Sequence, residues 1–379
     1  MNWEAEILEH GGIRPAARAN GIAESTLRRW LKRGYTGLPD SPASKTEDAS
    51  PGSIVPPGMR TRGTSTLYDE TGNVRLSWVK TQVDPEYMRR IMTEAAEEFS
   101  RTITPRIPVT AYPEIYDEDL VTAIVLTDYH MGMLAWGEEN GGQDWDLNIA
   151  EETILRYFTK ASFLSPPSGK VILANLGDML HFDGILPVTP TSKHVLDSDT
   201  RLQKIIRTVI RCIRIGVDII LERHKSVHLI NLSGNHDESS GAWLRECFSV
   251  FYSEDPRVTV EVSPDLYQCY EHGNTSLFFH HGHKRKVGNI DSVFASKFRD
   301  VFGRTKYSYA HVGHLHSSEL KETNLMIVEQ HRTLIAPDAY SSFGGWISGR
   351  SGNAITYHRD FGEISRATIP FDMISPIRG

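Results

Sequence analysis

The sequence has few cysteines, and it lacks an apolar leader. Its 379 residues include three cysteines, Cys212, Cys247 and Cys269, which lie far apart and form no CxxC pair. This spacing argues against a disulfide framework and against a thiolate metal site, and it favours a reducing compartment. The first residues, MNWEAEILEH, carry acids where a signal peptide needs a basic flank and an apolar core. We therefore expect a cytoplasmic protein.

The sequence also lacks a run that could span a bilayer. The most apolar long stretch, residues 205–221, is interrupted by Arg207, Arg211 and Arg214, and charged side chains at such positions are costly inside a membrane. The composition, 39% hydrophobic and 23% charged, is typical of a globular protein. A chain of this length is expected to form two or more domains. We expect no membrane partner, and a homo-oligomer is compatible with the sequence.

Excess positive charge is absent overall but present locally. The net charge is −7, which by itself argues against loose binding to nucleic acid. Basic residues are nevertheless concentrated in two segments. Residues 11–35 contain six basic side chains and one acid, and residues 283–306 contain seven basic side chains and two acids. The distribution of charge is therefore more informative than its sum.

The chain begins with a short helical region. Residues 1–35 predict three short helices, and the last two are joined by a turn at Gly21, with the basic helix second. This pattern is typical of a helix-turn-helix-like domain that binds DNA. A small bundle that docks onto protein is the alternative. Residues 36–62 are rich in Pro, Ser and Gly, which predicts a flexible linker.

The rest of the chain predicts a connector followed by an α/β domain. Residues 63–109 contain a predicted hairpin about a Thr-Gly-Asn turn and a helix over residues 84–102. Residues 110–379 alternate strand-like and helix-like segments, which is the α/β pattern. Five short apolar runs predict buried strands: residues 121–127, 170–176, 227–233, 275–280 and 307–312. A long helix is predicted over residues 200–224.

Each of these five runs leads into side chains that can bind metal. In chain order the strand ends carry DYH (128–130), GD (177–178), GNHD (234–237), HGH (281–283) and GHLH (313–316). One such group could be an ordinary turn, because Gly, Asn and Asp are common turn residues. Five in order are better explained by one site, because loops beyond the carboxyl ends of parallel strands converge on one crevice.

This ordered set of motifs resembles the calcineurin-like metallophosphoesterase superfamily over roughly residues 115–370. The resemblance implies a four-layer αββα sandwich with a two-metal site at one edge. It also implies ligand roles at matching positions: Asp178 would bridge the two metals. By the same resemblance, the first metal would also be bound by Asp128, His130 and His316. The second metal would also be bound by Asn235, His281 and His314.

Mixed imidazole and carboxylate ligands suit Mn²⁺, Fe or Zn²⁺ better than Mg²⁺, and we expect two divalent ions, with Mn²⁺ as the first choice. Two such ions can neutralise a phosphoester and acidify a bound water. His236 resembles the imidazole that stabilises or protonates the leaving group. We expect Asp237 to orient the ring of His236, and His181 either to orient His236, to touch substrate, or to serve only as a structural residue.

Two motifs differ from those of the protein phosphatases in this superfamily, and the difference narrows the expected activity. Protein phosphatases of this superfamily continue GDxxDRG and use GNHE, whereas this chain has GDMLHFDG and GNHD. The sequence thus looks closer to the nuclease and phosphodiesterase branch, and we expect a phosphodiesterase that acts as a DNA nuclease. The alternatives are a phosphomonoesterase or small-nucleotide phosphodiesterase whose N-terminal domain serves assembly, and a non-catalytic DNA-binding regulator. The order of helical domain, linker and α/β domain resembles phage proteins.

Two stretches beside the motifs are candidates for substrate contact. Lys284, Arg285 and Lys286 follow the HGH motif directly, so their charges either face the path of the phosphate or belong to a solvated loop. His283 is a weaker candidate for substrate contact and could equally be structural. Residues 338–346, DAYSSFGGW, are aromatic and rich in glycine, as either a base-stacking rim or a packed turn would be.

Overall fold

A computed structural model of the 379-residue chain describes most of the α/β region and parts of the N-terminal region. The described residues are 7, 13–19, 55, 59–69, 71–84, 87, 111–190 and 193–376. The chain divides into two compact units, Met1–Gln82 and Val83–Gly379. Each unit is described by itself.

The first unit contains one described helix and one hairpin. Helix α2 spans Ile13–Ala19, and strands β1 (Met59–Tyr68) and β2 (Val74–Val83) form a two-stranded sheet. The predicted hairpin is confirmed, but β1 begins at Met59, inside the segment expected to be a linker. The rest of the expected helix-turn-helix, most of the linker and the expected helix over 84–102 lie outside the described residues.

The second unit contains a six-stranded sheet in the order β13-β12-β3-β4-β5-β6. Strands β3, β4, β5 and β6 run parallel, and β12 and β13 add antiparallel strands beside β3. The carboxyl ends of β3, β4 and β5 therefore lie at one edge. The bounds are β3 (Asp117–Leu126), β4 (Ser168–Asn175), β5 (Val227–Asn231), β6 (Val258–Val260), β12 (Ser351–His358) and β13 (Gly362–Pro370).

A five-stranded sheet has the order β10-β11-β9-β8-β7. Strands β8, β9 and β11 are parallel, whereas β7 and β10 are antiparallel to their neighbours. The bounds are β7 (Gln268–His272), β8 (Thr275–Phe279), β9 (Tyr307–Val312), β10 (Glu319–Glu322) and β11 (Ile327–Gln330). All five strands predicted to be buried are present, with ends displaced by a few residues.

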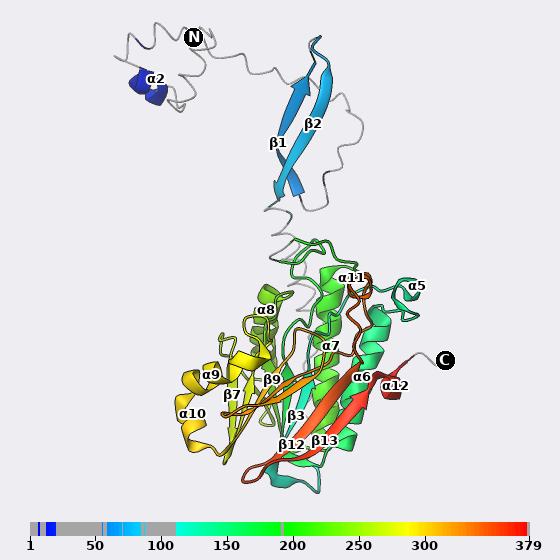
Figure 1. The fold of residues 1–379 in the computed structure, drawn as a ribbon, viewed down its shortest axis with the longest axis vertical. Helices are drawn as coiled ribbons and strands as arrows, with labels where there is room; N and C mark the ends of the chain where they lie inside the picture. Colours follow the sequence, from blue (N-terminus) through cyan, green and yellow to red (C-terminus); the bar gives the residue numbers. More distant parts are fainter. Residues whose placement is uncertain are drawn as a thin grey trace. The chain divides into compact units, whose positions relative to one another are not determined.

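Helices cover the outer face of each sheet, so the second unit has four layers (Figure 1). Helices α6 (Leu147–Leu164) and α7 (Leu202–Leu221), together with α8 (Glu238–Phe251), share a core with the six-stranded sheet. Helix α9 (Val287–Lys297) shares a core with the five-stranded sheet and is followed by α10 (Arg299–Arg304). The short helices are α5 (Gly137–Asn140), α11 (Ala339–Gly344) and α12 (Phe371–Ile374).

The alternation of side chains along the strands builds this sandwich. In β3, Val121, Ala123 and Val125 face the other sheet, whereas Ile124 and Leu126 face the helices. Because both faces are buried, the strand is apolar at nearly every position, as expected for strands covered on both sides. The αββα sandwich expected from the sequence is confirmed.

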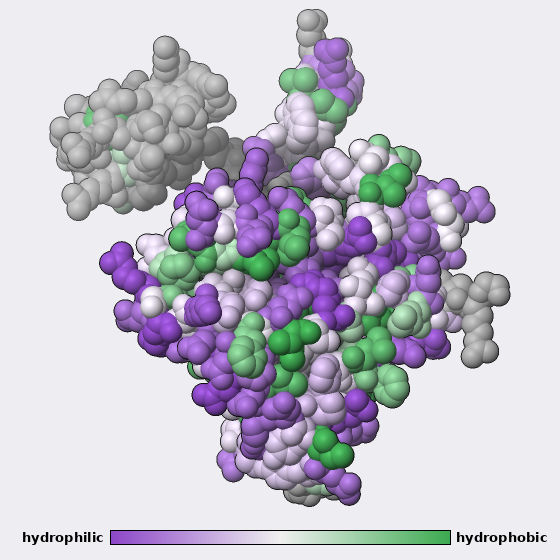
Figure 2. Space-filling model, turned by 60° about the horizontal axis from the view of Figure 1, so that its bottom comes forward, coloured by the Kyte–Doolittle hydropathy of each residue, from purple (hydrophilic) through white to green (hydrophobic). Residues whose placement is uncertain are grey.

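The surface of the molecule is mixed in polarity. On the face seen in Figure 2, hydrophobic residues occur in small groups among hydrophilic ones, which is ordinary for a globular protein. Within the part of the chain that the structure describes, none of the helices has the length and apolar character that crossing a bilayer requires.

Candidate metal centre

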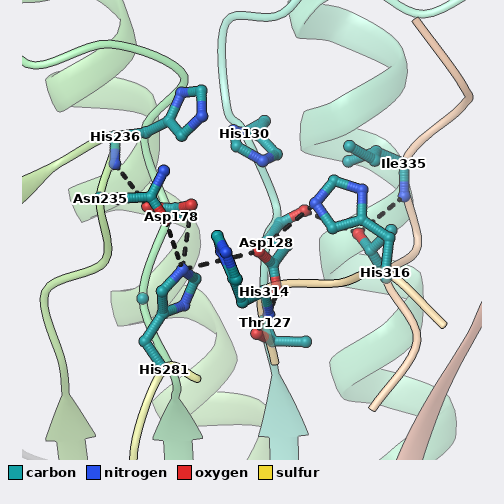
Figure 3. Close-up of polar contacts among 12 residues, drawn as sticks. Thr127, Asp128, His130, Asp178, Asn235, His236, His281, His314, His316 and Ile335 are labelled. Atoms are coloured by element: carbon teal, nitrogen blue, oxygen red, sulfur yellow. Dashed lines mark hydrogen bonds and ion pairs between the residues drawn. The ribbon is translucent and has the colours of Figure 1, made fainter. Parts of the chain in front are cut away.

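The predicted ligands come from five loops, each at the carboxyl end of a strand. Asp128 and His130 follow β3, Asp178 follows β4, and Asn235 follows β5. The other three follow strands of the second sheet: His281 comes after β8, and His314 and His316 come after β9. In Figure 3 these side chains point toward one another across the edge where the two sheets meet. The convergence predicted from the motifs is therefore present.

The backbone at the predicted ligands is strained. Among the described residues, six that are not glycine have a positive φ, and five of them are predicted ligands: Asp128, His130, Asp178, His314 and His316. Their φ angles lie between 44° and 76°. This left-handed region is costly for residues with a Cβ, and such strain is found mainly at functional sites. The loops are held in a conformation that local preference alone would not select.

Asp128 has one satisfied and one unsatisfied carboxylate oxygen. Its Oδ2 accepts the Thr127 hydroxyl at 2.6 Å and the His314 N–H at 2.7 Å. Its Oδ1 is buried without a hydrogen-bond partner and lies 3.4 Å from His316 Nε2 and 3.9 Å from His281 Nε2. A buried carboxylate oxygen without a hydrogen bond is costly unless a cation lies beside it. This oxygen fits a metal ligand.

His281 is oriented for metal binding. Its Nδ1 lies 3.1 Å from the carbonyl oxygen of Leu176 and donates to it, which leaves Nε2 free to act as a ligand. Nε2 lies 3.1 Å from Asp178 Oδ2 and 3.2 Å from Asn235 Oδ1. Three predicted ligands thus direct donor atoms at one point.

Donor distances among the histidines and carboxylates give three overlapping groups at this edge, and two of them share Asp128. In each group the donor atoms lie within 4.8 Å of one another. One of these two groups is Asp128, His130 and His316, and the other is Asp128, Asp178, His281 and His314. These donor sets fit two divalent metal ions. Asp128 is the residue common to both groups, whereas the bridging role expected for Asp178 stays a prediction.

Electrostatics favour ionised carboxylates at this edge. Burial would raise the pKa of Asp128, but His281 and His316 hold it far below its ordinary value. Burial would also raise the pKa of Asp178, but His281, His130 and His236 together hold it far below its ordinary value. Burial lowers the pKa of His281, yet Asp178 and Asp128 together raise that pKa to about 9. The carboxylates are thus held ionised, and His281 balances part of their charge.

Glycines allow the loops to approach one another. A Cβ at Gly234 would lie 2.0 Å from Asp178 Oδ1, and a Cβ at Gly313 would lie 1.9 Å from Thr127 Oγ1. Neither position can carry a side chain without moving a ligand loop. The glycines that precede Asn235 and His314 in the motifs are therefore explained by close packing.

His236 belongs to neither group that contains Asp128, but its ring forms a third group of close donor atoms with His130 and His181. Its ring centroid is 4.6 Å from that of His130, and its Nδ1 is 2.9 Å from the carbonyl oxygen of His181. If Nδ1 donates to that carbonyl, Nε2 is free for a substrate. The side chain of His181 is buried with Nδ1 3.4 Å from His130 Nδ1. Burial and the neighbouring His236 lower the pKa of His181 to about 3.

Asp237 does not orient His236 as the sequence suggested. Its buried carboxylate accepts backbone N–H groups from Asp178 (3.1 Å), Met179 (2.8 Å), Leu180 (3.2 Å) and Gly234 (2.8 Å). Burial and the nearby Asp178 raise the pKa of Asp237 to about 7. The physical reason for the difference is that both oxygens of Asp237 accept these backbone N–H groups, whereas His236 Nδ1 contacts a backbone carbonyl. The carbonyl of His181 holds the ring of His236 instead.

Asp183 makes the reciprocal contact, and sequence reasoning missed it. This residue belongs to the loop after β4, and its carboxylate accepts the N–H groups of Ser239 (2.5 Å) and Ser240 (2.6 Å) at the start of α8. Asp237 thus ties the β5 loop to the β4 loop, and Asp183 ties the β4 loop to α8. We call this pair the carboxylate clamps. A single sequence carries no signal that separates Asp183 from any loop aspartate.

The predicted substrate-contact residues lie beside the second group. His283 is half-buried, its Nδ1 has no hydrogen-bond partner among the described residues, and its ring centroid is 5.1 Å from that of His281. Lys284, Arg285 and Lys286 are exposed. The structure brings this basic loop to the edge of the cluster, and its contact with substrate stays a prediction.

A second histidine cluster lies between the sheets. His311, Glu329 and His331 are buried with donor atoms within 4.8 Å of one another. All four ring nitrogens have protein partners: His311 Nδ1 bonds His331 Nε2 (2.9 Å), and the outer nitrogens bond Tyr357 (3.0 Å) and Asn353 (3.1 Å). Burial lowers the pKa of both histidines to about 3. We call this set the packed histidine cluster; its donors are already used.

No protein-family model and no curated protein matches the chain. Among solved structures, an archaeal phosphodiesterase is 11% identical with a TM-score of 0.34, over 65% of this chain and 99% of its own. A 5′-nucleotidase precursor from Thermus thermophilus is 9% identical with a TM-score of 0.34, over 68% of this chain and 56% of its own.

A third similar structure, a predicted phosphoesterase from Streptococcus pneumoniae, is 13% identical with a TM-score of 0.28, over 66% of this chain and 98% of its own. At these identities and scores the likeness supports no conclusion about activity. Activity has to be inferred from the residues of the cluster.

Proposed function

We propose that this protein is a two-metal-dependent phosphodiesterase that hydrolyses nucleic acid, and specifically a DNA nuclease. The observation that carries the proposal is the pair of ligand groups that share Asp128. They stand on strained loops around a buried carboxylate oxygen that has no hydrogen bond. Two divalent ions held there, with Mn²⁺ the first candidate and Fe or Zn²⁺ possible, would supply charge neutralisation and an acidified water.

The protein's own residues supply the rest of the proposed chemistry. His236 lies outside the two ligand groups that share Asp128 and holds its Nδ1 on a backbone carbonyl, so Nε2 is placed to give a proton to a leaving oxygen. His283, Lys284 and Arg285 stand at the edge of the cluster, where positive charge would attract a phosphate chain. The basic residues within 11–35 support DNA as the partner.

One experiment tests the proposal. The purified protein, loaded with Mn²⁺, is incubated with bis-p-nitrophenyl phosphate, p-nitrophenyl phosphate, single-stranded DNA and double-stranded DNA. We expect hydrolysis of the diester and of DNA, and little hydrolysis of the monoester. Preference for the monoester would favour a phosphomonoesterase, and cleavage of the small diester without DNA would favour a small-nucleotide phosphodiesterase. No hydrolysis of any substrate by metal-loaded protein would reject catalysis.

The same panel tests the N-terminal region. A chain that lacks residues 1–82, the first compact unit, should hydrolyse the small diester like the full chain and bind DNA more weakly. Unchanged DNA binding would indicate that the N-terminal region serves assembly instead.

A further inference from the structure

Three aromatic side chains are exposed on the segment that follows β11. Tyr340 and Trp346 have exposed fractions of 70% and 60%, and Phe343 is exposed as well. Exposed large rings are unusual in a group, because a monomeric protein gains by burying them. We call Tyr340, Phe343 and Trp346 the aromatic rim.

The aromatic rim is built in a defined conformation. The side chain of Asp338 caps α11 by accepting the Ser341 N–H at 2.8 Å. A left-handed Gly345 ends the helix, and the ring of Trp346 folds back over Gly344, where a Cβ would lie 2.5 Å from that ring. Trp346 thereby comes to 5.1 Å from Tyr340 between ring centroids. The two rings are held together although both are exposed.

The aromatic rim adjoins the metal centre on the side of His316. The hydroxyl of Ser348 donates to the carbonyl oxygen of His316 at 2.5 Å. In Figure 3, His316 and Ile335 lie on one side of the cluster, and Asn235, His236 and His281 lie on the other. The aromatic rim follows Ile335 in the chain, whereas the basic loop 284–286 follows His281.

We propose that the aromatic rim binds a nucleobase of a single-stranded nucleic acid whose phosphate lies at the metal centre. This inference rests on the proposed function and adds the class of substrate. A single strand exposes the faces of its bases, and stacking on aromatic rings is the usual way in which proteins bind them. The phosphates match the positive charges of the basic loop and the cations that the ligand groups would hold. The faces of Tyr340 and Trp346 then take up the base.

The test compares two oligonucleotides with the same backbone. A short oligothymidylate and an abasic oligonucleotide of equal length, both with phosphorothioate linkages that slow hydrolysis, are bound to the Mn²⁺-loaded full chain, and fluorescence anisotropy gives the affinity. We expect the base-containing strand to bind roughly 5- to 150-fold more tightly, the range that stacking of one base supplies.

Variants locate the effect on the rim. Trp346→Ala and Tyr340→Ala should each remove most of the preference for bases and leave binding of the abasic strand unchanged. Phe361→Ala is the matched control, because Phe361 is 66% exposed and lies at the β12–β13 turn, beyond the pairing of His358 with Leu120 at the start of β3. It should change neither affinity. The salt dependence, which reports phosphate contacts, should stay the same in all three variants.

The outcomes separate this inference from the proposed function. Equal binding of both oligonucleotides, no binding of either, or a preference that survives both rim variants would overturn the inference even if Mn²⁺-loaded protein cleaves DNA. Base-dependent binding without any hydrolysis would support the inference and reject the proposed nuclease activity. A change in oligomeric state in the rim variants, without a change in base preference, would show that the rim contacts protein and would overturn it.

Discussion

The second unit contains two buried groups of histidine and carboxylate side chains, and they differ in what their polar atoms contact. In the packed histidine cluster every ring nitrogen has a hydrogen-bond partner within the protein. At the metal centre, Asp128 Oδ1 has none, and most ligands stand on left-handed backbone. Close grouping of ligand-type residues therefore does not identify a metal site. A buried carboxylate oxygen without a hydrogen bond, together with backbone strain, distinguishes the two groups, because a protein retains both only where something else compensates.

The largest expected effect comes from removing a ligand charge. Asp178→Asn should keep the protein folded but remove at least one metal and nearly all hydrolysis, because a neutral amide is a poor ligand between cations. Glu329→Gln, the matched change in the packed histidine cluster, should leave metal content unchanged. Metal analysis of both variants after dialysis, with diester hydrolysis in parallel, checks this. Two bound metals and normal turnover in Asp178→Asn would remove the residue from the site.

His236 should affect turnover and leave metal binding intact. We expect His236→Ala to retain both metals and near-normal substrate affinity while kcat falls on the order of 10²- to 10⁴-fold, the usual contribution of a positioned general acid. The loss should be smaller for a diester with a good leaving group such as p-nitrophenol. An equal loss on two diesters of different leaving-group pKa would limit His236 to electrostatic stabilisation, and a lost metal would make it a ligand.

The carboxylate clamps should have a smaller effect. Asp183→Ala frees the first N–H groups of α8 and loosens the loop that carries His181, whose carbonyl holds His236. We expect kcat to fall roughly 10- to 100-fold, as for other residues that orient catalytic groups, with metal content unchanged. Asp183→Asn retains one acceptor oxygen and should recover part of the loss. If Ala and Asn variants were both as active as the parent, the clamp would not position His236.

The sequence predicted the grouping of ligand-type side chains better than it predicted their surroundings. The apolar strands and the ligand motifs at their ends could be read because strand burial and ligand chemistry both restrict residue type. The partner of His236 could not be read, because a backbone carbonyl carries no residue identity. Asp237 was misassigned for the same reason: its partners are four backbone N–H groups. The start of β1 at Met59 was missed because hairpin pairing overrides the local preference of a polar segment.

The packed histidine cluster should make folding sensitive to acid. Burial lowers the pKa of His331 to about 3, whereas an unfolded histidine titrates near its ordinary value of about 6.5. Below pH 6.5 the unfolded chain therefore binds a proton at His331, whereas the folded chain does not until the pH approaches 3. The stabilising effect of keeping this histidine neutral is thus complete above pH 6.5 and declines as the pH falls toward 3.

At pH 5 the loss amounts to about 2 kcal/mol of unfolding free energy for one such histidine. His331→Asn removes the titrating group and keeps a side chain that can hydrogen-bond. Denaturant unfolding of metal-free protein at pH 7 and pH 5 should show that the variant loses about 2 kcal/mol less than the parent on acidification, even if the variant is less stable at both pH values. Equal losses of unfolding free energy in the two proteins would mean that His331 takes up a proton in the folded state. The packed histidine cluster would then tolerate a charged histidine.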